Sequence, residues 1–157
     1  GLVRVAHGIY LAPDAWEDGL FLLQSRFPKA VFSHETALFL LGLSEREPLR
    51  YSVTVADNQN TSGIRKTGVA VCRVKRELYS LGIVELPTPA GHTVKTYNAE
   101  RSLCDLLRRK NRIDNQDLQT ALKSYVRTKG SNLPELMRFA KTFSVESKIR
   151  PYLEMLL

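Results

Sequence analysis

The stretch FSHETALFLLGL, residues 32–43, predicts the end of a strand followed at once by a short helix. Ser33 stands at the N-cap position, and Glu35 lies in the first turn, where the helix dipole favours negative charge. Gly42 supplies the flexible residue at which such a helix ends. His34 beside Glu35 suggests a catalytic pair, but neighbours on a helix point about 100° apart and cannot serve one site directly.

Strand patterns fill the first two thirds of the chain. The alternating segment 51–56 predicts a half-buried strand, and the apolar run 69–74 predicts a buried one. Between them, residues 57–68 predict a polar loop that carries Arg65 and Lys66. Further strands are expected at 4–11, as one strand of a hairpin bent by Gly8, and at 83–86 and 92–97, which flank a turn.

Helical spacing dominates the last third. One earlier helix is expected to begin with a capping box at Asp14 and to end at Pro28. Asn98 can cap the first of four later helices, in which Arg101 and Asp105 are spaced to pair at i,i+4. The other three have apolar faces around Leu118, Leu122 and Tyr125, around Leu133, Leu136 and Ala140, and around Val145, Ile149 and Leu153, with Asp114 as the cap of the first and a kink expected at Pro151. The expected fold is therefore α+β: a small mixed or antiparallel sheet with flanking helices, followed by a C-terminal helical bundle.

The composition fits one ordinary domain, with 157 residues of which 43% are hydrophobic. No apolar run approaches the roughly 18 residues that span a bilayer, and no signal-peptide pattern opens the chain. Cys72 and Cys104 lie far apart and lack metal-ligand spacing, so we expect two reduced core thiols and no zinc site. These features predict a cytoplasmic protein without a membrane contact, metal or cofactor.

Positive charge is concentrated toward the C-terminus, within a net charge of +7. Residues 1–100 hold 11 Lys and Arg against 10 Asp and Glu, whereas residues 101–157 hold 12 against 6. The segment between Asp117 and Glu135 contains three cations and no acidic residue that could balance their charge. Such an imbalance favours a polyanionic partner, and the lack of interleaved aromatic residues favours double-stranded over single-stranded DNA. The candidate DNA-binding residues are Arg4, Arg65, Lys66, Arg108, Arg109, Lys110, Arg112, Lys123, Arg127 and Lys129.

Enzymatic chemistry is not expected. The chain has no nucleophile elbow, no phosphate-cradling glycine loop and no His-x-x-x-His pair. Glu85 and Lys95 faintly suggest a nuclease carboxylate–lysine arrangement, but two strands joined by a turn often place an acid near a lysine. We expect His34 to be a structural histidine at the helix start, hydrogen-bonded to backbone. No catalytic residue is therefore assigned.

Four motifs in combination resemble the AbiEi family, the antitoxins and transcriptional regulators of AbiE-type bacterial abortive-infection systems. They are RVAHGIY at 4–10, FSHETAL at 32–38, RELYSLGI at 76–83 and ERSLCD at 100–105. The resemblance implies a transcriptional autorepressor whose N-terminal winged helix-turn-helix binds inverted repeats in its own promoter. It also implies the antitoxin of a type IV toxin–antitoxin system, which neutralises a nucleotidyltransferase-like toxin without forming a stable complex and confers phage resistance.

The resemblance also implies the domain organisation. Residues 1–12 match only the wing of the winged helix, so the helices that would precede it are missing, as in a truncated form. Residues 13–157 match the antitoxin domain, with an α/β part at 13–97 and a helical part at 98–157. One alternative stays open: a protein-interaction module whose basic helical face docks an acidic protein partner.

Overall fold

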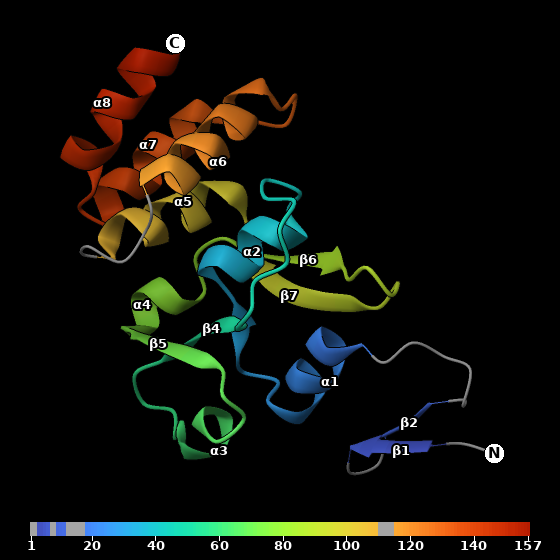
Figure 1. Ribbon diagram of the computed structural model, residues 1–157. Helices are drawn as coiled ribbons and strands as arrows, with labels where there is room; N and C mark the ends of the chain where they lie inside the picture. Colours follow the sequence, from blue (N-terminus) through green and yellow to red (C-terminus); the bar gives the residue numbers. More distant parts are fainter. Residues whose placement is uncertain (1–2, 7–8, 12–17, 110–114) are drawn as a thin grey trace.

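The predicted strand-to-helix junction lies at the centre of the computed structural model, which describes residues 3–6, 9–11, 18–109 and 115–157 (Figure 1). Strand β3 (Val31–Phe32) leads, through one residue, into helix α2 (His34–Leu40). Gly42 has a φ of 76° and ends the helix, with the backbone N–H of Leu43 donating to the carbonyl oxygen of Leu38. This bond belongs to the Schellman ending that glycine permits, so the predicted helix stop is confirmed.

Strand β3 is the central strand of a mixed five-stranded sheet with the strand order β5-β4-β3-β7-β6. Strand β4 runs antiparallel to β3 and parallel to β5, whereas β7 runs parallel to β3 and antiparallel to β6. The added strands are β4 (Ser52–Ala56), β5 (Ala70–Val74), β6 (Ile83–Pro87) and β7 (Thr93–Tyr97). The α+β prediction is confirmed, and of its two sheet forms the mixed one is observed.

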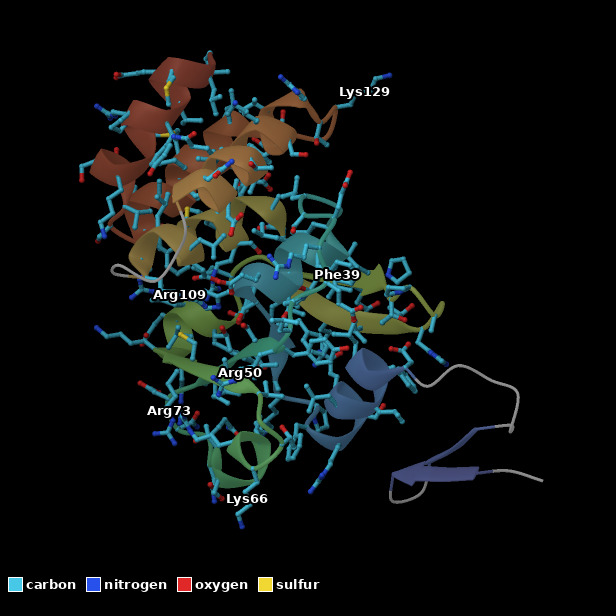
Figure 2. The ribbon with its side chains drawn as sticks, in the orientation of Figure 1. Phe39, Arg50, Lys66, Arg73, Arg109 and Lys129 are labelled. Carbon is cyan, nitrogen blue, oxygen red and sulfur yellow. The ribbon has the colours of Figure 1, made fainter. Side chains whose placement is uncertain are left out.

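Strand position within the sheet overturns two burial predictions. All five residues of β4, predicted half-buried, are buried, because β4 lies inside the sheet with α2 against it and Val53 and Val55 in a hydrophobic cluster. Strand β5 was predicted to be buried but forms the sheet edge, where only Val74 is buried and Arg73 is exposed (Figure 2). Cys72, on the same edge strand, is only partly buried, so it is not the core thiol that was predicted.

Besides α2, three described helices accompany the sheet in the α/β part of the chain: α1 (Gly19–Arg26), α3 (Ser62–Arg65) and α4 (Arg76–Tyr79). The segment predicted as a polar loop at 57–68 thus contains the one-turn helix α3. Helix α1 has Asp18 as its N-cap, whose side chain accepts a hydrogen bond from the backbone of Phe21. The predicted capping box at Asp14 lies outside the described residues.

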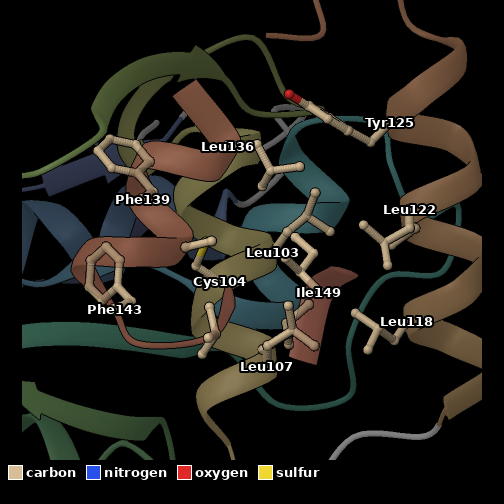
Figure 3. Close-up of a cluster of buried hydrophobic side chains, with 14 of the residues drawn as sticks. Leu103, Cys104, Leu107, Leu118, Leu122, Tyr125, Leu136, Phe139, Phe143 and Ile149 are labelled. Atoms are coloured by element: carbon tan, nitrogen blue, oxygen red, sulfur yellow. The ribbon is translucent and has the colours of Figure 1, made fainter. Parts of the chain in front are cut away.

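Four helices form the C-terminal part: α5 (Ala99–Arg108), α6 (Asn115–Arg127), α7 (Leu133–Thr142) and α8 (Glu146–Leu156). Asn98 caps α5 as predicted, accepting from the backbone of Arg101 at 2.9 Å. Pro151 lies inside α8, and the predicted cap Asp114 is outside the described residues. The helices share one hydrophobic cluster, which contains the fully buried Cys104 (Figure 3). Leu38 of α2 joins that cluster, so the central junction ties the sheet to the helices.

The N-terminal segment forms a separate two-stranded antiparallel sheet of β1 (Val3–Ala6) and β2 (Ile9–Leu11). Residues 4–11 therefore contain two strands and not the single strand that was predicted. Arg4 lies in β1, opposite Tyr10 of β2.

Candidate nucleic-acid interface

The structure separates the predicted DNA-binding residues into distinct places. Lys129, after α6, and Lys66, after α3, lie at opposite ends of the molecule in Figure 2, with Arg109 between them. Arg4 lies in the separate hairpin. Lys110 and Arg112 lie outside the described residues. One continuous surface formed by all of the predicted residues is thus not what the fold provides.

Helix α6 presents its cations to solvent. Lys123 and Arg127 are exposed and lie one turn apart, whereas Leu122 and Tyr125 on the same helix are buried. Lys129 is exposed in the loop that follows, and the hydroxyl of Tyr125 accepts from the backbone N–H at the far end of that loop at 2.8 Å. None of the three cations forms an ion pair within the part of the chain that the structure describes. Their charge is therefore available to an anionic partner.

Arg108 and Arg109 end α5 in different surroundings. The guanidinium of Arg109 lies 2.5 Å from the carboxylate of Glu35, in the first turn of α2. Arg108 is exposed, and its guanidinium lies 5.4 Å from the ring centroid of Phe143. The charge of Arg109 is thus balanced by the carboxylate of Glu35, whereas Arg108 forms no ion pair with a described residue.

A groove of about 1280 Å³ lies between the end of α2, the sheet edge and the C-terminal helices. Its lining includes Cys72 of β5, Arg108 and Arg109 of α5, and Thr120 of α6. All five residues of β5 also line it. The groove therefore joins the free edge of the sheet to the basic end of α5.

His34 is buried and neutral at the base of this region. Its side chain is 5% exposed, and burial together with the charge of Arg109 lowers its pKa from 6.5 to about 3. Its Nδ1 lies 2.8 Å from the hydroxyl oxygen of Ser33, which also accepts from the hydroxyl of Thr54. A structural role is thus supported, but the partner is a side chain and not the predicted backbone. Because its hydroxyl makes these bonds, Ser33 occupies the N-cap position without capping α2.

The faint nuclease arrangement has an ordinary structural explanation. Glu85 and Lys95 are directly opposite in the β6–β7 ladder, as expected for two strands joined by a turn. The amine of Lys95 donates to the carbonyl oxygen of Pro28 at 2.9 Å. Within the described ranges, no three His, Cys, Asp or Glu residues gather to hold a metal ion.

A second constellation was not predicted from the sequence, because Asp18 lies 70 residues from Thr88 and 74 residues from His92. The hydroxyl of Thr88 donates to Asp18 Oδ2 at 2.5 Å, and His92 Nδ1 lies 2.8 Å from the same oxygen. Burial raises the pKa of Asp18, but these bonds outweigh burial and leave that pKa lowered. The imidazole contacts the carboxylate and not the hydroxyl, so this arrangement does not activate Thr88 as a nucleophile. It fixes the β6–β7 turn to the start of α1.

Two further arginines, Arg50 and Arg73, join Arg65 and Lys66 around α3. Arg50 Nε donates to the carbonyl oxygen of Gly68 at 2.6 Å, and Arg73 donates to Gln59 O at 3.1 Å. The sequence does contain a sign of this region, since residues 58–76 carry five cations and no acid. We call Arg50, Arg65, Lys66 and Arg73 the α3 surface.

The described helices include none that is both long and apolar enough to cross a membrane. In comparisons with known proteins, the chain matches no family model and no curated protein.

Proposed function

We propose that this protein is a non-enzymatic antitoxin and DNA-binding transcriptional autorepressor of the AbiEi type, acting in the cytoplasm against a nucleotidyltransferase-like toxin. The observation that carries the DNA-binding part is the solvent-facing row of Lys123, Arg127 and Lys129, which lacks carboxylate partners within the described residues. The antitoxin part rests on the resemblance of the four motifs to that family.

These cations suit the phosphate backbone of duplex DNA. Lysine and arginine contacts to phosphates give affinity and register but do not read sequence. Promoter specificity is therefore assigned to a winged helix, whose wing residues 1–12 resemble. The cations of α6 would bind the phosphate backbone of the duplex, and the winged helix would recognise the inverted repeats.

Fluorescence anisotropy with a promoter duplex and a scrambled duplex, at roughly 50 and 200 mM salt, tests this proposal. We expect a steep loss of affinity between the two salt concentrations, with little preference for the promoter. The double variant K123E/R127E should bind both the promoter duplex and the scrambled duplex more weakly. The matched control R138E/R150E makes the same charge change at exposed arginines that already have carboxylate partners. Equal binding by the unchanged chain and K123E/R127E would remove the α6 row from the interface.

The antitoxin role is tested separately by co-expression with the toxin encoded beside it. Growth should be rescued, and pull-down of the tagged antitoxin should retain DNA but not the toxin, since a stable complex is not expected. If the chain binds DNA but does not rescue growth, the antitoxin role is excluded and only the role in transcriptional regulation remains.

The groove favours a second candidate, an interaction module for an acidic protein partner. An exposed edge strand can accept an added strand from a partner, and β5 is such an edge beside Arg108. A toxin retained in the pull-down, and released by R108E, would support this candidate over DNA binding.

A further inference from the structure

Two arginines of the α3 surface share one neutral hydrogen-bond acceptor. Arg65 Nε lies 3.0 Å and Arg73 Nη2 lies 3.3 Å from the hydroxyl oxygen of Thr61, and both donate to it. The two guanidinium groups are thus held within two hydrogen-bond lengths of each other. Both arginines are exposed, while Thr61 is buried.

Neither arginine forms an ion pair within the described residues. The arginines that do form ion pairs there are Arg101, Arg109, Arg138 and Arg150, each with a carboxylate. Arg65 and Arg73 instead bond only to the hydroxyl of Thr61 and, for Arg73, to the carbonyl oxygen of Gln59. Neighbouring like charges repel, so an anion placed between them would relieve that repulsion.

The unused hydrogen-bonding capacity at this point consists of donors. The two lone pairs of the Thr61 hydroxyl are occupied by the two arginines, and each guanidinium retains further N–H groups. A ligand that only accepts hydrogen bonds matches this set, and guanidinium groups bind phosphate through paired N–H bonds. Because Thr61 and Gln59 already orient the arginines, little side-chain entropy remains to be lost on binding.

We propose that Arg65 and Arg73, oriented by Thr61, form a phosphate-binding site. Its ligand is a phosphate group, either a phosphodiester of a nucleic-acid backbone or free inorganic phosphate. With a phosphodiester as ligand, the site rests on the proposed DNA binding and adds a second contact, which lies at the opposite end of the molecule from Lys129 and does not depend on the α6 row.

Nuclear magnetic resonance of the ¹⁵N-labelled chain tests the site through the arginine Nε–H signals. Millimolar inorganic phosphate should shift the Arg65 and Arg73 signals at constant ionic strength, whereas the signal of ion-paired Arg150 should stay unchanged. A short duplex that shifts the same two signals would identify the ligand as a phosphodiester, and a response to phosphate alone would identify it as free phosphate. The absence of a shift with both probes would overturn the proposal.

The variant R65Q/R73Q measures the contribution of the site. For a phosphodiester ligand, duplex affinity should fall about tenfold and the salt slope should decrease by about 1. The duplex affinity of R138Q/R150Q, which loses the same charge, should fall much less. R65K/R73K keeps the positive charge but lacks the planar guanidinium groups, so it should bind duplex and phosphate more weakly than the unchanged chain. This variant replaces R65Q/R73Q in the test if the glutamine variant does not fold.

The two proposals fail separately. If R65Q/R73Q and R65K/R73K bind duplex and inorganic phosphate as the unchanged chain does, the site is overturned even when K123E/R127E loses duplex binding. If K123E/R127E binds normally while R65Q/R73Q does not, the α3 site stands and the α6 row does not.

Discussion

Arg101 of α5 and the arginines of the α3 surface use the same side chain in opposite surroundings. Arg101 is completely buried, and its Nε lies 3.2 Å from a carboxylate oxygen of Asp105. Its Nη1 donates to the carbonyl oxygen of Leu81 at 2.7 Å, and its guanidinium lies 4.0 Å from the ring centroid of Tyr97 and 4.6 Å from that of Phe143. Among the described residues, the arginines of the α3 surface have only neutral oxygens as acceptors.

The difference separates an arginine that serves the fold from arginines that are open to a partner. A buried guanidinium must be compensated, because an unpaired charge in the interior is costly. An exposed guanidinium bound to neutral oxygens keeps its charge for an external anion at little cost in water. The pair with Asp105 lies within α5, whereas the bond to the carbonyl oxygen of Leu81 and the contact with the ring of Tyr97 connect α5 to the sheet part of the chain.

Removing Arg101 should have the largest effect. R101A leaves Asp105 buried without its partner, and breaking such a pair costs about 3–5 kcal/mol of unfolding free energy. Urea denaturation measures the loss. R138A, which breaks an exposed pair with Glu135, should change stability by less than about 1 kcal/mol. An R101A variant as stable as R138A would mean that Arg101 does not stabilise the contact between the sheet and the C-terminal helices.

The second effect depends on pH and concerns His34. Its pKa is 6.5 in the unfolded chain and about 3 in the fold, so below pH 6.5 the unfolded state binds a proton that the folded state excludes. Stability from His34 is complete above pH 6.5 and is lost as pH falls toward 3, at about 1.4 kcal/mol per pH unit.

H34N provides the comparison, because asparagine tolerates the φ of 55° at this position and does not titrate. Between pH 6.5 and 5, urea denaturation should show about 2 kcal/mol more loss in the unchanged chain than in H34N. Equal losses would indicate that His34 becomes protonated inside the fold despite the nearby arginines.

The predictable features are those that depend on residues close together in the chain. The helix stop at Gly42, the Asn98 cap and the Arg101–Asp105 pair each involve residues no more than five positions apart, and each was predicted correctly. Local propensity is enough to specify them.

Features set by strand order were not predictable in the same way. The burial of β4 and the exposure of β5 follow from which strand lies at the edge, and alternation of residues does not encode that order. The pairing of Arg65 with Arg73 likewise requires the β4–β5 crossover to fold α3 back beside the edge strand. Sequence indicated the charge of this segment but not the convergence of its arginines.

The double variant R65Q/R73Q should change stability least. R65Q/R73Q changes two exposed side chains and removes their hydrogen bonds to the buried hydroxyl of Thr61, but it also removes repulsion between two like charges. These contributions oppose each other, so unfolding free energy should change by about 0.5 kcal/mol or less in urea denaturation. A loss comparable to that of R101A would mean that Arg65 and Arg73 stabilise the β4–β5 crossover. Their charge would then serve the fold, as that of Arg101 does, and the contrast between the buried and the exposed arginines would not hold.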